Sequence, residues 1–325
     1  AVTTANSGGG IITFTCTGTI TFTGALTITA DVDIIGGAGI IFDGGNTTRL
    51  FIVDPGGDLT IDSLTLQNGN AASGGAIFNP SGLLTVTNSR LLNNTAVSGG
   101  GAIYSTLNST VSNSYLSGNA SAGFGGAIYH GGIGDLTVNN NQFVSNFSDQ
   151  GGAIFVAQAF AFISNSTFFN NVAVQRGGAI VNTGTMTVGN STFYNNSAPL
   201  GGGFFQLVAV GSVSASMVHT TFLNNSGGAI QVDNANVNVD YSIISGSGSQ
   251  CIQNAPGTLN IPSNNMADSA CMSATVVGFL NFGTFDGIVI PLLTGSPAID
   301  IYMCAGADQI GTIRPQGTSC DLGAF

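Results

Sequence analysis

Few side chains in this sequence are suited to catalysis. The 325 residues include 15 Asp but neither Glu nor Lys. Cleavage of a polysaccharide needs paired carboxylates or a carboxylate cluster around Ca²⁺, commonly with a Lys or Arg base. Asp31 and Asp33 would share one face of a strand, but no further acidic residue lies near them in the sequence, and Asp58 and Asp62 form no Asp-Asp pair. We therefore expect a protein that is not an enzyme, with a polysaccharide lyase or hydrolase as one alternative.

Metal and cofactor chemistry find little support either. His130 and His219 lie 89 residues apart, we expect both in turns, and two histidines without a third ligand do not make a zinc site. The cysteines lack the closely spaced pairs that structural metal sites use. The sequence therefore predicts no catalytic, cofactor-binding or metal-binding residue, and no cofactor.

The five cysteines indicate disulfides instead. Four of them lie in the last 75 residues, where short loops favour the pairs Cys304–Cys320 and Cys251–Cys271, each worth about 3 kcal/mol in the chain-entropy model. Cys16 would then be free or paired over a long distance. Local disulfides form in oxidising compartments, and the chain begins at Ala1 rather than Met, as a processed secreted chain would. We expect an extracellular or cell-surface protein.

The elements that would position any functional side chain repeat along the chain. The tetrapeptide Gly-Gly-Ala-Ile, once replaced by Gly-Gly-Phe-Phe, recurs every 25 or 26 residues, beginning at Gly74, Gly100, Gly125, Gly151, Gly177, Gly202 and Gly227. In phase with it, an apolar residue stands three positions before an Asn, from Leu91 and Asn94 to Phe222 and Asn225. A fixed period in the twenties that is rich in Gly, Asn, Ser and Thr is typical of a solenoid.

Each repeat is long enough for three short strands and three turns, so it predicts one coil of a right-handed single-stranded parallel β-helix of about ten coils. In-phase residues should stack in inward columns. One column holds Ile77, Ile103, Ile128, Ile154, Ile180, Phe205 and Ile230. A second holds Leu91, Leu116, Phe143, Phe168, Phe193 and Phe222. A third holds Val86, Val111, Val138, Ile163 and Val188, with Ala215 and Val237 as its candidate continuation.

The extent of the repeat predicts how the chain is divided into domains. Residues 1–246 are expected to form the all-β helix, with irregular coils over 1–73 and regular repeats over 74–246. Residues 247–325 contain five of the eight prolines and four of the five cysteines. We expect them to form an irregular C-terminal cap that contains the disulfides.

The abundant asparagines and threonines are expected to have structural roles rather than a role in binding. Nine Asn-x-Ser/Thr sequons occur, at Asn46, Asn93, Asn108, Asn119, Asn146, Asn165, Asn190, Asn195 and Asn224. Several fall on the Asn columns of the repeat, where stacked amides would satisfy backbone groups in turns; glycosylation is the alternative for the others.

A flat threonine array that binds ice is disfavoured, because Phe162 interrupts the column of Thr137 and Thr187. Since Phe160 and Phe162 share a face, we expect them to contact a partner or a covering loop.

Charge and hydropathy exclude two classes of partner. The formal net charge of −11 argues against nucleic acid and against anionic membrane surfaces. No stretch reaches the 18 to 20 consecutive apolar residues, roughly, that a membrane span needs. We therefore expect no nucleic-acid partner and no membrane span.

The C-terminal motifs carry a resemblance. Gly295-Ser296-Pro297-Ala298-Ile299-Asp300, Asp308-Gln309-Ile310-Gly311, Arg314-Pro315-Gln316-Gly317 and Cys320-Asp321-Leu322-Gly323-Ala324-Phe325 are similar to the signature of the bacterial secreted proteins called choice-of-anchor Q, in the pectin-lyase-like superfamily. The repeats also resemble the passenger domains of chlamydial polymorphic outer-membrane proteins. The resemblance implies the fold and a location outside the cell. It departs at the N-terminus, where Gly8-Gly9-Gly10 leads into Ile11 without the short helix of the relatives.

These observations favour a non-enzymatic structural protein. An uncapped first coil exposes unpaired backbone groups, so we expect copies to assemble head to tail into a fibre. Ile11, Ile12 and Phe14 would bury their side chains against the C-terminal region of the next copy. The alternative is a monomeric cell-surface adhesin or carbohydrate-binding passenger, whose partner would be a surface polysaccharide or a host or neighbouring cell surface.

Overall fold

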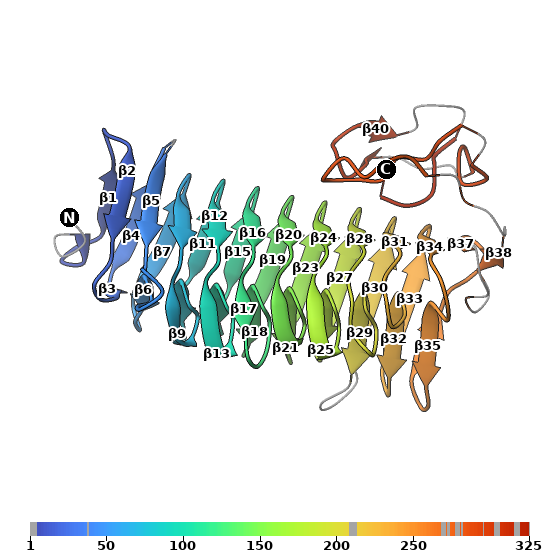
Figure 1. The fold of residues 1–325 in the computed structure, drawn as a ribbon, viewed down its shortest axis with the longest axis horizontal. Coiled ribbons are helices and arrows are strands. Elements are labelled where there is room, and N and C mark those ends of the chain that lie inside the picture. Colours follow the sequence, from blue (N-terminus) through green and yellow to red (C-terminus); the bar gives the residue numbers. More distant parts are fainter. Residues whose placement is uncertain are drawn as a thin grey trace.

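The computed structural model describes residues 5–37, 39–207, 213–267, 271, 274–276, 280, 282–294, 296–301, 306–314 and 319–324. The chain winds into a parallel β-helix (Figure 1). Among the described residues, its strands form three long sheets, here called A, B and C, of 11, 12 and 10 strands, and a shorter sheet D of 5. In the regular coils the chain passes through the sheets in the order A, B, D and C.

Sheets A and B carry the first two strands of each coil. Sheet A consists of β1 (Gly10–Thr13), β4 (Asp31–Ile35), β7 (Asp58–Asp62), β11 (Leu84–Thr87), β15 (Ser109–Ser112), β19 (Asp135–Asn139), β23 (Phe160–Ser164), β27 (Thr185–Gly189), β30 (Ser214–Val218), β33 (Asn236–Asp240) and β36 (Thr258–Asn260). Sheet B consists of β2 (Gly18–Thr21), β5 (Ile40–Asp43), β8 (Thr65–Gln67), β12 (Arg90–Leu92), β16 (Tyr115–Ser117), β20 (Gln142–Val144), β24 (Thr167–Phe169), β28 (Thr192–Tyr194), β31 (Thr221–Leu223), β34 (Ile243–Ser245), β37 (Met266–Ala267) and β38 (Thr275–Val276).

Sheets D and C complete each coil. Sheet D consists of β9 (Asn70–Ser73), β13 (Thr95–Gly99), β17 (Ala120–Ser121), β21 (Phe147–Gln150) and β25 (Val172–Arg176). Sheet C consists of β3 (Leu26–Ile28), β6 (Phe51–Val53), β10 (Ile77–Asn79), β14 (Ile103–Ser105), β18 (Ile128–Gly131), β22 (Ile154–Ala157), β26 (Ile180–Asn182), β29 (Phe204–Leu207), β32 (Ile230–Asp233) and β35 (Cys251–Asn254). A short antiparallel pair, β39 (Gly306–Ala307) and β40 (Ile313–Arg314), lies outside the helix.

The predicted isoleucine column is confirmed, with one correction. Ile77, Ile103, Ile128, Ile154 and Ile180 pair in parallel register and are buried. The next residue in the column is Phe204, not Phe205, and it pairs with Ile230. The cause is a third glycine: Gly203 occupies the position of the alanine, so its carbonyl accepts the Ile180 N–H. Phe205 faces away from the core, where the Arg176 guanidinium carbon lies 5.3 Å from the centroid of its ring.

The second column is confirmed, and the continuation of the third is wrong. Phe143, Phe168, Phe193 and Phe222 stack with ring centroids 4.6–4.9 Å apart and within 10° of parallel. In the third column Val188 pairs with Met217, whereas Ala215 and Val237 belong to the neighbouring inward column of Met186. The longer connection between β29 and β30 shifts the register, and the period of the repeat does not reveal the shift.

A ladder of buried asparagines lines the corner after sheet B. Each Nδ2 donates to a backbone carbonyl and, except at the last member, Asn225, to the Oδ1 of its counterpart in the next coil, as Asn171 does to Phe143 and Asn196, both at 2.9 Å. The ladder contains Asn94, Asn119, Asn146, Asn171, Asn196 and Asn225. Two sequon asparagines, Asn119 and Asn146, are therefore enclosed in the core, which confirms the structural interpretation for those two.

The parallel sheets extend beyond residue 246. Strands β35, β36, β37 and β38 continue sheets C, A and B, so the predicted boundary of the helix is too early. The described residues after β38 do not lie across the end of the helix as a cap. Its described residues from 280 to 324, here called the fold-back segment, return along the outer face of sheet B over β24 to β34 (Figure 1). They bury Leu280, Ala298 and Leu322 against Ile243 and Met266.

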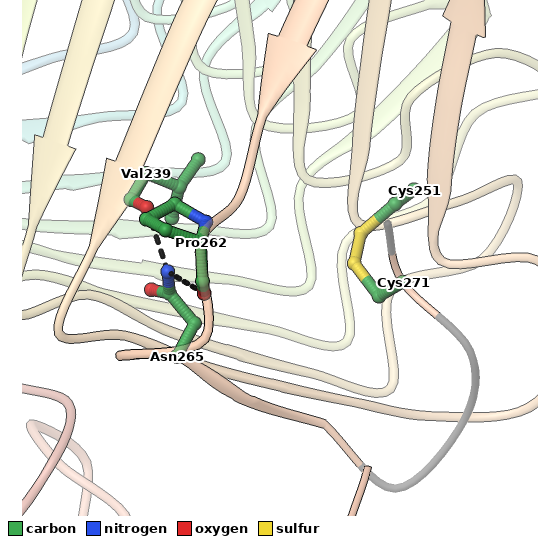
Figure 2. The surroundings of a disulfide bond; sticks show 5 residues. All are labelled: Val239, Cys251, Pro262, Asn265 and Cys271. Carbon is green, nitrogen blue, oxygen red and sulfur yellow. Dashed lines mark hydrogen bonds between the residues drawn. A yellow bond between two sulfur atoms is a disulfide. The ribbon is translucent and has the colours of Figure 1, made fainter. Parts of the chain in front are cut away.

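The predicted disulfide Cys251–Cys271 is present, with Cα atoms 5.2 Å apart. Figure 2 shows it beside the turn in which Asn265 donates to the carbonyls of Val239 and Pro262. Of the other predicted pair, Cys320 is buried and Cys304 lies outside the described residues. Cys16 is free and exposed.

The described residues before β1 cover part of the first coil. Asn6 donates to the Thr27 carbonyl at 2.7 Å and accepts from the Thr29 N–H at 3.0 Å. The edge of β3 is therefore occupied by the chain itself, whereas an uncapped first coil was expected. Ile12 and Phe14 are half-buried against the core, whereas Ile11 points outward and is 65% exposed.

Candidate functional site

The carboxylates of the first coils lie in structural positions. Asp58 lies opposite Asp31 in sheet A, a neighbour relation that the sequence does not reveal. The Asp62 carboxylate accepts hydrogen bonds from Thr87 and Asn88, and the Thr87 bond in particular lowers the pKa of Asp62 below its ordinary value. No group of three or more His, Cys, Asp or Glu side chains converges within the described part of the chain.

One of the two histidines, His130, differs from the prediction, and His219 agrees with it. His219 lies at a turn and stacks on Tyr241 with centroids 5.4 Å apart. His130 lies in strand β18 rather than in a turn, and it is fully buried. Its Nε2 donates to the Gly134 carbonyl at 2.9 Å, while Nδ1 has no hydrogen-bond partner among the described residues. The Gly134 carbonyl, in the short connection between β18 and β19, gives this inward histidine a hydrogen-bond acceptor.

His130 should make stability depend on pH, because burial lowers its pKa below the ordinary 6.5. Above that pH the imidazole is neutral in both states. As the pH falls below it, the unfolded chain takes up the proton first, so the free energy of unfolding decreases until the lowered pKa is reached. Urea unfolding between pH 7.5 and 5 should show this loss, and His130→Gln should reduce it. Equal pH dependence in His130→Gln and in the control His219→Gln would contradict the assignment.

A continuous hollow follows the outer corner between sheets A and B. Three adjoining depressions of about 550, 460 and 330 Å³ share lining residues. Asn113, Asn140 and Asn165 line the first two, and Asn88 and Arg90 line the second and third. We call this hollow the lateral groove. It reaches from Gly37 and Gly39 in the early coils to the fold-back segment.

The rim of the lateral groove is a row of amide side chains. At the end of each sheet A strand the chain turns through a left-handed residue, where asparagine is favoured among residues with a side chain. Consecutive coils lie roughly 4.8 Å apart, so the amides repeat at that spacing. The row consists of Asn88, Asn113, Asn140, Asn165 and Asn190, with φ between 45° and 56°. These asparagines are visible in the sequence, but that they lie on one outward face becomes clear only from the register of the coils.

The floor of the lateral groove contains one aromatic ring and is nearly uncharged. Arg90 lies over the ring of Tyr115, with its guanidinium carbon 4.6 Å from the centroid. Gln142 follows them on the next coil of sheet B. Of the residues that line the three depressions, Arg90 and Asp308 alone carry charge. Nothing in the sequence pattern singled out Arg90 or Tyr115. The groove can therefore offer amide hydrogen bonds and one aromatic face to an uncharged ligand.

The exposed phenylalanines lie elsewhere, on sheet A. Phe162 stands between Thr137 and Thr187 in an outward column, and Phe160 lies on the same face. The Phe160 side chain is 56% exposed and the Phe162 side chain is 47% exposed. No described loop covers them, so the covering loop is not found, and contact with a partner stays a prediction.

The comparisons with known proteins identify the fold family. A family model described as a right handed beta helix region matches residues 3–198, which is more than half of the chain. No curated protein and no solved structure matches the sequence. Within the described residues, no helix is long and apolar enough to span a membrane. The register of the strands and the matched region agree, and the chain belongs to the right-handed β-helix family.

Proposed function

We propose that this β-helix is a non-enzymatic extracellular binding protein that holds a neutral polysaccharide in the lateral groove. The observation that carries the proposal is the in-register row of outward asparagines beside Tyr115. Sugar hydroxyls donate and accept hydrogen bonds, as primary amides do, and the apolar face of a sugar ring packs on an aromatic ring. The resemblance to secreted choice-of-anchor Q proteins supports the extracellular location.

Charge narrows the class of polysaccharide. A polyuronate would meet a protein of net charge −11, and long-range repulsion would oppose its approach. Within the groove a single cation, Arg90, already lies against Tyr115. The groove therefore fits an uncharged glycan better than an acidic one.

Affinity electrophoresis tests the proposal. The protein should be retarded in native gels that contain a soluble neutral glucan, in at least one linkage of an α- and β-glucan panel, and not in gels that contain polygalacturonate. Tyr115→Ala should weaken binding about tenfold, which corresponds to a loss of about 1.4 kcal/mol. The matched control is Tyr104→Ala, because Tyr104 is half-buried on the outer face of sheet C, away from the groove. Retention of polygalacturonate alone, or equal weakening by both substitutions, would contradict the proposal.

End-to-end assembly is a second candidate, favoured by one observation at the first coil. Ile20, Phe42 and Leu66 occupy one inward column, and their exposed fractions are 44%, 4% and 0%. A second copy that covers Ile20 would bury apolar surface and pair the open edges of β1 and β2. Among the described strands, the last ones at the other end are β35 in sheet C, β36 in sheet A and β38 in sheet B.

Electron microscopy of the purified protein tests the assembly. Filaments should run along the coil axis, and Ile20→Asp should abolish them because it charges the contact. The control is Ile133→Asp, since Ile133 is 92% exposed on a loop in the middle of the helix. A protein that light scattering finds monomeric at high concentration would eliminate the assembly and leave the groove untouched.

A further inference from the structure

We propose that the lateral groove recognises the end of a glycan chain, because the fold-back segment closes the groove at one end. The inference rests on the proposed function and adds the mode of binding. A groove open at both ends would accept any internal stretch of a polymer. A groove with a fixed wall accepts a stretch that includes a terminus.

The wall is a tight turn of the fold-back segment. The Asp308 carboxylate accepts the N–H groups of Ile310 and Thr312 at 3.0 and 2.8 Å. The Asp308 N–H donates to the Thr312 carbonyl at 2.9 Å. These bonds fix the shape of the turn, which presents Ile310, 54% exposed, at the end of the groove.

Buried polar contacts anchor the wall to the helix. Gln309 is 4% exposed, donates from Nε2 to Thr167 Oγ1 and accepts from Thr192 Oγ1, both at 2.7 Å. At the rim, Asn190 donates to the Ala307 carbonyl at 3.1 Å. The last asparagine of the amide row therefore bonds the wall, whereas its predecessors line the open groove.

The fold-back segment also covers sheet B on the coils that anchor the wall and on the coil after them. Phe285 packs on Phe169 and Tyr194 with ring centroids 4.7 and 5.1 Å apart. Further along, the Ala324 N–H donates to Thr221 Oγ1 at 3.1 Å. A glycan in the groove cannot pass along these strands, so its terminal sugar must lie against Asp308, Gln309 and Ile310.

Stoichiometry distinguishes end recognition from internal binding. The probe is the neutral glucan retained best in the affinity gels, fractionated by chain length, with a cyclic glucan of the same linkage. At saturating protein, analytical ultracentrifugation should find one protein bound per linear chain whatever its length, and none on the cyclic glucan. Bound protein that rises in proportion to chain length, or equal binding of the cyclic glucan, would overturn end recognition while the proposed function stands. Absence of binding to every linear fraction would overturn both.

A variant of the wall provides the second test. Gln309→Ala removes the anchor of the turn, so longer chains should now bind several copies. The matched control is Gln175→Ala, because Gln175 is exposed and bonds Asp149 on sheet D. Circular dichroism should show that both variants keep the β-helix. A Gln309→Ala protein that is folded and still binds one copy per chain would count against the wall. Reduction of the glucan's aldehyde end to an alditol then reports which terminus is held: lost binding assigns the reducing end, and retained binding the non-reducing end.

Discussion

Replacing Asn171 by alanine is expected to lower the free energy of unfolding by about 3–5 kcal/mol. In the intact ladder, the Asn171 Oδ1 accepts hydrogen bonds from the backbone N–H and the Nδ2 of Asn146. The Asn171 Nδ2 donates to the Phe143 carbonyl and to the Asn196 Oδ1. Alanine leaves these partners buried without a hydrogen bond, and each such group costs about 1–3 kcal/mol. Denaturant unfolding followed by circular dichroism measures the loss.

The adjacent residue provides the control. Asn170 lies at the outer side of the same corner with φ 55° and is half-exposed. Glycine adopts that backbone conformation without strain, so Asn170→Gly should change the free energy of unfolding by less than about 1 kcal/mol. If both variants unfold at the same denaturant concentration, the buried ladder does not contribute as argued.

The periodic part of the fold could be predicted because each coil repeats the same local rules. Ile77 to Ile180 follow a period of 25 or 26 residues. The steps from Leu91 to Phe222 vary between 25 and 29 residues, but the apolar residue three positions before an Asn marks each coil, and these in-phase residues stack in space. The prediction failed where the spacing changes. Gly203 shifts the predicted register by one residue and the connection before β30 shifts it by two, and only the hydrogen bonds reveal where each shift occurs.

The candidate site depends on contacts that local patterns do not encode. Arg90 and Tyr115 meet because neighbouring coils align them, and a period search finds columns of one residue type rather than mixed pairs. The fold-back segment joins residues more than 100 positions apart, such as Gln309 with Thr192. The composition of the last quarter of the chain differs from that of the repeats, but it carries no information about which face the fold-back segment covers.

Replacing Gly126 by alanine is expected to cost more than about 4 kcal/mol. In the Gly-Gly-Ala-Ile corner the first glycine, Gly125, has a φ of 60°, and the second lies against the next coil. A Cβ on Gly126 would be 2.1 Å from the Gly152 carbonyl oxygen and 2.6 Å from that of Phe147. Because both obstacles are backbone atoms, relief requires the two coils to separate, which breaks the pairing of β18 with β22.

A glycine without close neighbours provides the control, because its replacement by alanine shows the effect of the substitution without a steric clash. Gly189 lies in β27, and a Cβ added there would have the Val218 carbonyl oxygen as its nearest neighbour, at 4.0 Å. Gly189→Ala should therefore be neutral or stabilise by up to about 1 kcal/mol, through a smaller entropy of the unfolded chain. Soluble yield and the denaturant midpoint of both variants measure the contrast. Similar midpoints would mean that the paired glycines are not required for close stacking, and the motif that defines the repeat would need a different cause.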